Sequence, residues 1–392
     1  MGKVKVLTAR QAADLIKDGD TVTLSGFVAN GIAEALNAAA EERFLETGHP
    51  KDLTLFWVAG TGNKDGSHAD HYAHEGMVKK VIGGHFNFVP KICEMLSDNK
   101  IEGYNVPQGA IAQMLRDNAA HKVGTISHVG IGTFADPRNG GGRLSEKTKE
   151  DIVKVIELEG QEQLFYPRIP LDVAFIRGTY ADELGNITLE KEMAPLDATS
   201  QAMAVHNNGG LVVVQVERVV KAGHLDPKLV KIPGIYVDAV VECPADDPKQ
   251  SQSINCTYDP AYAGNTQVPV SSLEPKKLDA KKIIGRRAAM ELKKNVVVNL
   301  GVGVPEWVSS VAAEEGVADE MTLTVECGPV GGVPGGGLRF GGSVNAQAYM
   351  DEGYQFDFYD GGGLDLCFLG LAEVDNNGDV NVSRLGTRIT GS

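Results

Sequence analysis

Helical and extended hydrophobic patterns alternate along the chain, and the same order of elements occurs twice. Near the start, a short amphipathic helix ends at a D-G-D turn, and a strand at Thr21–Leu24 then runs into a glycine. From about residue 287 the pattern returns, with a helix followed by a strand at Val296–Asn299 that also runs into a glycine. A helix start containing a glutamate, Glu34 or Glu306, follows each glycine. This alternation predicts an α/β fold built around parallel sheets.

Two further pairs of segments align in the same order. Asp52–Gly60 matches Glu320–Gly328, and Ala174–Thr188 matches Cys367–Val382. In the second pair a buried strand passes through a glycine-containing stretch to a hairpin whose turn is L-G-N in one copy and N-N-G-D in the other. The duplication therefore predicts two homologous open α/β domains in tandem.

The repeat also sets the predicted domain boundaries. We expect an N-terminal domain at 1–234, a linker at 235–278 and a C-terminal domain at 279–392. The linker contains P-A-D-D-P-K-Q-S-Q-S, a composition typical of connecting segments. After its hairpin the first copy continues into Gly209–Val216, a predicted central strand, whereas the second copy stops soon after its own hairpin. The C-terminal domain is therefore expected to be incomplete.

Composition excludes several classes of partner. The 392 residues are 42% hydrophobic and 23% charged, and 37 basic against 52 acidic residues give a net charge of −15. This balance argues against nucleic acid or an anionic membrane as a partner. No apolar run approaches the roughly 18 residues of a membrane span, and the start lacks the apolar core of a signal peptide, so a cytoplasmic protein is expected. The five cysteines are scattered without C-x-x-C spacing, and no metal site is expected.

One carboxylate distinguishes the two copies. Where the first copy has Val58 at the end of a strand, the second has Glu326, followed by the glycine-rich run C-G-P-V-G-G-V-P-G-G-G. A buried charge is costly unless it is paired, hydrogen bonded or protonated. The carboxyl ends of strands are also where α/β folds bind ligands. Glu326 is therefore either an exposed or ion-paired structural residue, or an acid, base or covalent nucleophile.

Glycine-rich motifs are spread over essentially the whole chain. They are S-G-F-V-A-N-G (25–31), E-G-Y-N-V-P-Q-G (102–109), G-I-G-T-F-A-D-P-R-N-G-G-G (130–142), F-I-R-G-T-Y-A-D-E-L-G-N-I-T (175–188), P-G-I-Y-V-D (233–238), N-L-G-V-G-V-P-E (299–306), V-E-C-G-P-V-G-G-V-P (325–334), Y-Q-F-D-F-Y-D-G-G-G-L-D (354–365) and N-V-S-R-L-G (381–386). Together they resemble the family I coenzyme A transferases, specifically the propionate (lactate or acetate) CoA-transferase branch. Cys327 departs from the usual Ser or Gly of that family, and Pro329 from its frequent Ala. The chain also ends before the family's C-terminal glycine-rich segment and last strand.

The resemblance implies transfer of coenzyme A between a short-chain acyl-CoA and a free acid such as propionate, acetate, lactate or butyrate, in an active site between the two domains. Glu326 stands at the family's nucleophile position. It would form an acyl-glutamyl anhydride and then a glutamyl-CoA thioester, with ping-pong kinetics. Gln108 resembles the glutamine that approaches the reacting acyl group. The resemblance implies no cofactor beyond coenzyme A itself, and a homo-oligomer.

Two glycine loops complete the candidate site. One follows a strand and opens a helix, so its backbone N–H groups suit an oxyanion or CoA, although a packing turn fits equally: Gly301, Val302 and Gly303. The other would shape the channel for the pantetheine arm, or form a plain turn: Gly361, Gly362 and Gly363. Two alternatives to CoA transfer stay open. They are an acyl-CoA hydrolase on the same fold and an inactive CoA-binding fragment.

Three other patterns carry weaker signals. The segment 130–135 fits the dinucleotide pattern G-x-G-x-x-A, but Asp136-Pro137 disfavours the helix that would bind a pyrophosphate. The H-x-x-H-x-x-H run of His68, His71 and His74 lies in polar surroundings, which favour a solvated face or an inter-domain contact over a metal site. A basic run over 276–287 indicates a solvated helix face, with contact to CoA phosphates as the alternative.

Overall fold

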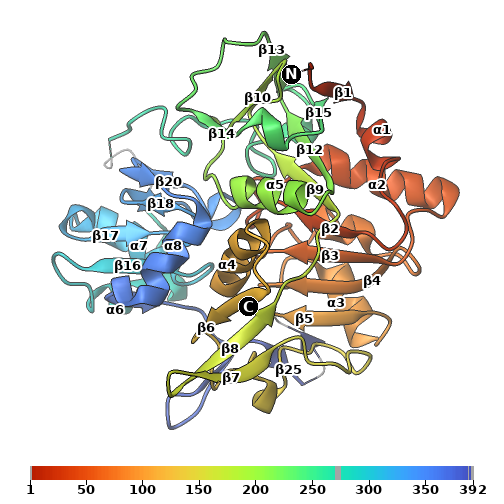
Figure 1. The fold of residues 1–392 in the computed structure, drawn as a ribbon. Helices are drawn as coiled ribbons and strands as arrows, with labels where there is room; N and C mark the ends of the chain where they lie inside the picture. The colour runs from red at the N-terminus through yellow and green to blue at the C-terminus, as the bar shows by residue number, and fades with distance from the viewer. Residues whose placement is uncertain (1, 270–274, 387, 390–392) are drawn as a thin grey trace.

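The computed structural model describes residues 2–269, 275–386 and 388–389 and contains two sheets with parallel strands at their centres (Figure 1). The larger sheet has eight strands in the order β1-β15-β12-β9-β2-β3-β4-β5, and every neighbouring pair is parallel. Its strands are β1 (Lys5–Leu7), β15 (Ala239–Glu242), β12 (Leu211–Val216), β9 (Val173–Arg177), β2 (Thr21–Leu24), β3 (Leu53–Trp57), β4 (Val78–Gly83) and β5 (Glu102–Asn105).

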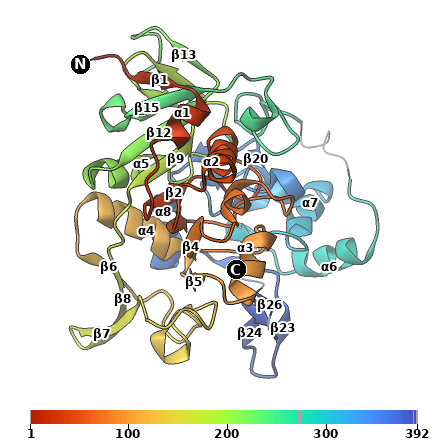
Figure 2. The same cartoon turned by 90° about the vertical axis from the view of Figure 1, so that its right-hand side faces the viewer.

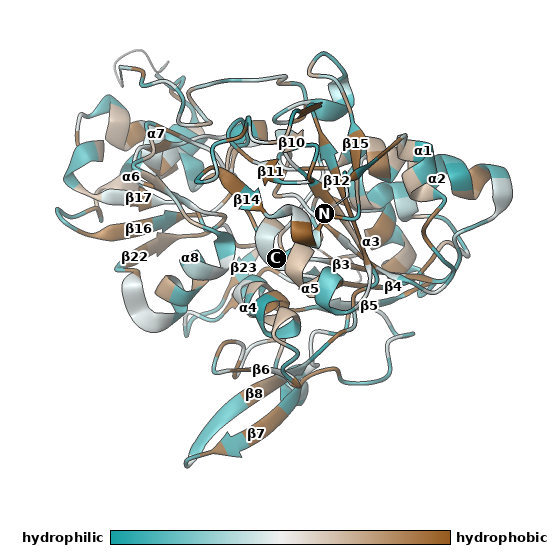
Figure 3. Ribbon diagram, turned by 45° about the horizontal axis from the view of Figure 1, so that its top comes forward, coloured by the Kyte–Doolittle hydropathy of each residue, from teal (hydrophilic) through white to brown (hydrophobic). Residues whose placement is uncertain are grey.

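Helices cover both faces of this sheet, which explains why its strands are hydrophobic along their whole length. In β3, Leu53, Leu55 and Trp57 point to one face, and Phe56 points to the other. The first face is packed by α1 (Ala9–Ala13), α2 (Glu34–Thr47) and α3 (Pro90–Ser97), and the second by α4 (Gln108–Ala119) and α5 (Ala198–Asn207). Figure 3 shows the resulting hydrophobic centre between more polar helices.

The smaller sheet has the order β21-β18-β17-β16-β22, in which β16 is parallel to both β17 and β22. Its strands are β16 (Val297–Leu300), β17 (Thr322–Thr324), β18 (Pro329–Val330), β21 (Ala348–Tyr349) and β22 (Leu366–Phe368). Residues of α6 (Ala280–Ala289) and α7 (Glu306–Glu314) pack with Val298, Leu300 and Leu323 of this sheet. Helix α8 (Glu352–Phe358) contacts α4 and so lies between the two sheets (Figure 1).

The remaining elements are short. A separate antiparallel sheet is formed by β6 (Gly124–Ser127), β7 (Lys154–Leu158) and β8 (Gln161–Pro167). A mixed sheet, in which β10 is parallel to β13 and the other neighbours are antiparallel, is formed by β10 (Tyr180–Asp182), β11 (Ile187–Thr188), β13 (Arg218–Val220) and β14 (Val230–Ile232). Three strand pairs follow: β19 (Val333–Pro334) with β20 (Ser343–Val344), β23 (Glu373–Val374) with β24 (Val380–Asn381), and β25 (Arg384–Leu385) with β26 (Arg388–Ile389). The single turns are η1 (His68–Tyr72), η2 (Pro137–Asn139), η3 (Gly234–Tyr236), η4 (Pro248–Gln250), η6 (Ala318–Glu320), η7 (Gly337–Arg339) and η8 (Tyr359–Gly363).

The α/β class and the repeat predicted from the sequence are confirmed by the strand order. The three aligned strands form the parallel set β9-β2-β3 in the larger sheet and β22-β16-β17 in the smaller one. The hairpin β10–β11 follows β9, and the hairpin β23–β24 follows β22. The domain boundaries stay a prediction. Within the predicted linker 235–278, β15 is hydrogen bonded between β1 and β12, so this part of the range belongs to the larger sheet.

The chain passes between the two sheets twice. It leaves the larger sheet after β15 and enters the smaller one at α6. It returns after β22, because Ile389 of β26 is buried in the core of the larger sheet and β26 contacts α3 (Figure 2). On this return path the Arg384 guanidinium donates to the carbonyl oxygen of Leu144 at 2.6 Å. No helix of the described residues has both the length and the apolar character of a membrane span.

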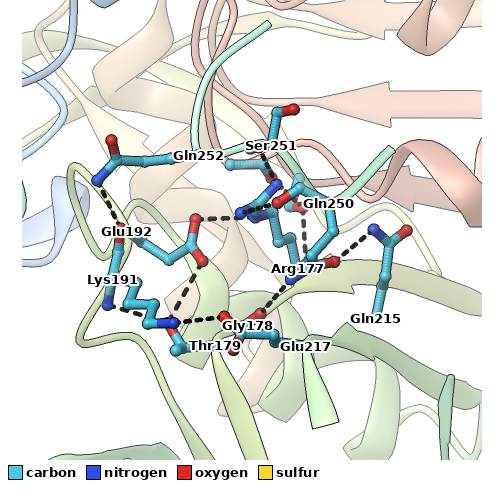
Figure 4. A network of polar contacts seen from close by, with 12 residues as sticks. Arg177, Gly178, Thr179, Lys191, Glu192, Gln215, Glu217, Gln250, Ser251 and Gln252 are labelled. Carbon is cyan, nitrogen blue, oxygen red and sulfur yellow. Dashed lines mark hydrogen bonds and ion pairs between the residues drawn. The ribbon is translucent and has the colours of Figure 1, made fainter. Parts of the chain in front are cut away.

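Polar contacts attach the segment after β15 to the carboxyl ends of β9 and β12 (Figure 4). The buried guanidinium of Arg177 donates to Glu192 at 2.8 Å, to the carbonyl oxygen of Gln250 at 2.9 Å, and to that of Ser251. The side chain of Gln250 in turn accepts from Gln215 at 2.7 Å. Arg177 and Glu192 are each only 4% exposed, so this ion pair is a buried one.

The histidine run lies against α2 and not on a solvated face or at a contact between the predicted domains, so that expectation is wrong. His68 is fully buried, and its Nε2 is bonded to the carbonyl oxygen of Ser25 at 3.1 Å. His71 is bonded to Glu34 at 2.7 Å and to Glu41 at 2.5 Å. The polar composition of the run reflects these pairs with α2. The described residues contain no group of three or more His, Cys, Asp or Glu side chains arranged to hold a metal ion.

The His71 pairs make stability depend on pH. Burial alone lowers the pKa of His71, but the hydrogen bonds and charges of Glu34 and Glu41 outweigh it, so the pKa is raised. A raised pKa in the folded state stabilises the protein below the unfolded pKa of about 6.5, and this contribution is lost as the pH rises through the higher folded pKa. We expect the melting temperature of the wild type to exceed that of His71→Gln most at acidic pH, and the gap to shrink at alkaline pH. Circular dichroism measures the two melting temperatures. A difference between them that does not change with pH would contradict the raised pKa of His71.

Candidate active site

Glu326 lies just past the carboxyl end of β17, in a tight turn that joins this strand to β18. The turn is closed by a hydrogen bond from Val325 N–H to the Pro329 carbonyl oxygen at 3.0 Å, and Val325 and Cys327 are buried. Gly328 has φ +136°, and a Cβ at this position would lie 2.2 Å from the Met350 carbonyl oxygen. Only glycine fits there, which explains the glycine two residues after the predicted nucleophile.

A neighbouring strand supplies the hydrogen bond to the Glu326 carboxylate. Asn299 of β16 pairs in register with Thr324 of β17, and its Nδ2 donates to Glu326 Oε2 at 3.1 Å. The Tyr359 hydroxyl accepts from the same Nδ2 at 3.4 Å, donates to Thr324 Oγ1 at 2.6 Å, and accepts from Gln355 Nε2 at 2.9 Å. These bonds hold the Asn299 amide with its N–H groups toward Glu326.

Burial raises the pKa of Glu326, because removal from water disfavours the charged form. Hydrogen bonds from its own backbone and from Asn299 act in the opposite direction without cancelling the effect. A carboxylate held in this way is more basic than one in water, and a more basic carboxylate is a better nucleophile.

Gln108 is the first residue of α4 and approaches the site from the larger sheet. Its side chain is half-buried, and Nε2 donates to Glu352 Oε1 at 2.5 Å. The loop after β4 passes directly beneath it, since a Cβ on Gly84 would lie 2.1 Å from the Val58 carbonyl oxygen and 3.2 Å from Gln108 Cα. Val58, which occupies the position of Glu326 in the first copy, therefore lies next to Gln108.

Glu352, the first residue of α8, brings the two predicted catalytic residues together. It is hydrogen bonded to Gln108, and its carboxyl group interacts electrostatically with Glu326. Its backbone N–H donates to the Leu196 carbonyl oxygen at 3.1 Å, which ties α8 to the segment before α5. The site thus lies where the carboxyl ends of strands from both sheets meet.

An apolar cluster closes the gap between the sheets beside this site. Phe27 from the loop after β2 stacks on Phe340 at 5.7 Å between ring centroids, and Cys327 belongs to the same cluster. Asn30 Nδ2 donates to the Phe340 carbonyl oxygen at 2.9 Å. The S-G-F-V-A-N-G motif therefore contributes to the contact between the two halves.

Two of the three backbone N–H groups in the predicted oxyanion loop are already used within the protein. Gly301 N–H donates to the Phe368 carbonyl oxygen at 2.8 Å, which extends the pairing of β16 with β22. Gly303 N–H donates to Glu306 Oε1 at 2.7 Å. Among the residues that the structure describes, the Val302 N–H has no hydrogen-bond acceptor. Glu306 also accepts from Gly337 N–H at 2.9 Å and so links the loop to the glycine-rich segment after β19.

The second predicted glycine loop forms the turn η8 between α8 and β22. Gly361 and Gly362 face open space, and Gly362 has φ +90°. A Cβ on Gly363 would lie 2.2 Å from the ring of Phe358. The turn follows directly from Tyr359 of the Asn299 network.

The weaker sequence signals lie elsewhere. Residues 130–135 form turns and not a helix, as expected from Asp136-Pro137. The basic run lies on α6, but its expected solvated face is wrong for Lys282, which is 7% exposed and ion paired with Glu314 at 2.5 Å.

Sequence reasoning missed Asn299, Tyr359 and Glu352. Asn299 opens the N-L-G-V-G-V motif and aligns with the strand that leads into the first copy's glycine, which was a usable signal. Glu352 carries no such signal, since no patterned motif distinguishes it from other acidic residues at helix starts.

Comparisons with known proteins agree with this geometry. Residues 6–243 match the family described as coenzyme A transferase. Acetate CoA-transferase YdiF of Escherichia coli strain K12 is 43% identical over 394 residues, which cover 100% of this chain and 73% of YdiF. Caffeate CoA-transferase of Acetobacterium woodii is 42% identical over 392 residues, covering 99% of this chain and 75% of the relative.

Solved structures show the same similarity. The apoenzyme of acyl-CoA transferase YdiF from Escherichia coli O157:H7 superimposes with a TM-score of 0.92 at 42% identity, over 100% of this chain and 73% of that one. A thioester complex of the same enzyme with CoA gives a TM-score of 0.92 at 41% identity, with the same coverage.

Proposed function

The chain belongs to the coenzyme A transferase family and is a CoA-transferase that moves coenzyme A between an acyl-CoA and a carboxylate, and from this premise we propose that Glu326 is its covalent nucleophile. The observation that carries the proposal is the half-buried Glu326 carboxylate, which has a raised pKa and is held by one side-chain hydrogen bond at the junction of the two sheets. We further propose that short-chain acids of the propionate, acetate, lactate and butyrate class are the substrates.

The proposed reaction has two halves. The Glu326 carboxylate attacks the thioester carbonyl, forming an acyl-glutamyl anhydride and expelling CoA thiolate. The thiolate then attacks the glutamyl carbonyl and releases the free acid, which leaves a glutamyl-CoA thioester on Glu326. The acceptor acid reverses these steps. Covalent catalysis of this kind keeps the thioester energy and gives ping-pong kinetics.

Donors near Glu326 suit the charge that develops on each tetrahedral intermediate. We propose that the Val302 N–H and the Gln108 amide serve as these donors, because the neighbouring amides of Gly301 and Gly303 are bonded within the protein. In this proposal Gly361 and Gly362 border the path of the pantetheine arm, since both face open space. No cofactor beyond coenzyme A enters the scheme. A homo-oligomer and a cytoplasmic location stay predictions.

Intact-mass spectrometry tests the nucleophile. After brief incubation with acetyl-CoA or propionyl-CoA, we expect a CoA-sized mass gain that hydroxylamine removes and that is absent in Glu326→Gln. Glu320→Gln is the matched control, because this nearby carboxylate pairs with Lys294 at the surface and should leave the gain intact. An adduct that persists in Glu326→Gln, or a wild type that forms none, contradicts the proposal.

Product analysis tests the substrate class. The acceptor panel is acetate, propionate, lactate, butyrate and caffeate, the last because one relative carries its name. Formation of the new acyl-CoA supports transfer to that acid, with the short-chain acids expected to be preferred. Release of free CoA without a new acyl-CoA would instead identify a hydrolase.

A further inference from the structure

Three helices begin at one buried point beside the proposed nucleophile. Gln108 is the first residue of α4, Glu352 is the first residue of α8, and Asp197 is the N-cap residue of α5. Glu352 is 1% exposed and Asp197 is 4% exposed. Asp197 does not cap its own helix, because its side chain makes no hydrogen bond to the first turn of α5. Two carboxyl groups are therefore buried together where the proposed mechanism uses neither.

The surroundings of Asp197 favour a proton shared with Glu352. Within the described residues, neither carboxylate oxygen of Asp197 is reached by an N–H or hydroxyl donor in good geometry. The hydroxyl of neighbouring Ser200 donates to the Asp197 carbonyl oxygen instead, at 3.0 Å. The side chains of Asp197 and Glu352 interact with each other. Because two ionised carboxylates cannot form a hydrogen bond between them, this contact favours the protonated form of one of the two.

Electrostatics place this proton on Glu352. Burial, followed by the charge of Asp197, raises the pKa of Glu352 well above its usual range, and the charge of Glu326 adds to this. Around Asp197, burial and the charge of Asp351 raise the pKa, while Arg116 of α4 lowers it. Lys231, at 3.7 Å from Asp351, is the further cation on this side. The pair therefore carries a single negative charge shared across a hydrogen bond.

We propose that Glu352 and Asp197 are positioning residues for CoA transfer: neutral Glu352 accepts from Gln108 Nε2 and donates its proton to Asp197, and so fixes the Gln108 amide toward Glu326. This inference rests on the proposed function. The chain of bonds runs from the Gln108 N–H to the Glu352 carbonyl oxygen and from the Glu352 O–H to the Asp197 carboxylate. Such a chain orients an amide that would otherwise rotate freely in a half-buried position, and orientation of this kind is a large part of catalysis.

Kinetics of acetyl-CoA with propionate test the proposal through three variants. Glu352→Ala leaves the Gln108 amide unheld, and we expect kcat to fall by about 10²-fold with a much smaller change in KM, as for a misplaced catalytic group. Glu352→Gln recovers most of this loss, because its amide accepts from Gln108 and donates to Asp197 in the same geometry. Glu352→Ala adds little in a Gln108→Ala background, since it acts through Gln108.

The pH profile separates positioning from simple packing. In the wild type, kcat falls as the pH rises through the pKa of the shared proton, because two adjacent buried carboxylates repel each other and release Gln108. Glu352→Gln has no such proton, so this alkaline limb disappears or moves to higher pH. Glu320→Gln is the control. It removes a surface ion pair with Lys294, at 2.9 Å, which involves neither the carboxyl pair nor Arg116, and should leave the profile unchanged.

Several results would overturn the inference. They are a Glu352→Gln variant as impaired as Glu352→Ala, full additivity with Gln108→Ala, an unchanged alkaline limb in Glu352→Gln, or an equal loss in Glu320→Gln. Should Glu352→Ala fail to fold, Glu352→Gln still decides through its pH profile. The two proposals fail separately. A wild type without the Glu326 adduct contradicts the nucleophile, whereas a normal adduct with unaffected Glu352 variants contradicts only the positioning role.

Discussion

Glu326→Gln should lower CoA transfer by about 10⁴-fold or more, the scale seen when an enzyme loses its covalent nucleophile. The amide keeps the shape of the carboxylate but cannot form the anhydride or the thioester. Because Glu326 is a half-buried carboxylate with a raised pKa and one side-chain donor, replacing it with a neutral group should not lower the melting temperature. Steady-state rates and thermal melts of wild type, Glu326→Gln and Glu320→Gln check both expectations. Transfer by Glu326→Gln at near wild-type rate would refute the mechanism.

The kcat of the wild type should also fall at acidic pH, because Glu326 becomes protonated there. Its pKa is raised by burial, so the nucleophilic form is lost as the pH falls through that raised value. This limb lies on the opposite side of the profile from the one expected for the Glu352–Asp197 pair, and the two are separable in a single titration of kcat.

Arg177→Ala should reduce the free energy of unfolding by about 3–5 kcal/mol, the usual result of removing one partner of a buried ion pair. The substitution leaves the Glu192 carboxylate buried without its cation, and it also frees the carbonyl oxygens of Gln250 and Ser251. Chemical denaturation followed by circular dichroism measures the loss. The segment after β15 should become sensitive to limited proteolysis at the same time.

Two controls distinguish an unpaired charge from a lost contact. Lys191→Met removes the neighbouring pair with Glu217, which is more exposed, and should cost about 1 kcal/mol or less. The double variant Arg177→Met with Glu192→Leu removes both charges and should recover much of the stability lost in Arg177→Ala. A double variant as unstable as the single one would show that the carbonyl contacts, and not the charge, dominate.

The sequence identified the nucleophile position because the two copies of the repeat can be compared with each other. Val58 and Glu326 stand at the same place in two copies of one pattern, and a carboxylate in place of valine at a strand end is visible without a structure. The repeat was predicted in the same way, and the match between β9-β2-β3 and β22-β16-β17 confirms it. The order of the strands within each sheet was not predicted.

The partners of that carboxylate depend on contacts between distant segments. Nothing local links Asp197 to Glu352, which meet only because α5 and α8 begin at the same point between the sheets.

The histidine run illustrates the opposite error. Its polar composition suggested exposure to solvent. Instead, His71 pairs with Glu34 and Glu41 of α2, a helix that lies well before it in the sequence. The N–H groups of Gly301 and Gly303 were likewise predicted as donors without knowledge of the acceptors that Phe368 and Glu306 supply.

The two passages of the chain between the sheets have a mechanical consequence. The smaller sheet is attached before α6 and again through the path that ends at Ile389. Between these attachments the Phe27–Phe340 contact and the Gln108–Glu352 hydrogen bond also join the two halves. Any displacement of Glu326 relative to Gln108 must therefore disturb contacts on both sides of the site.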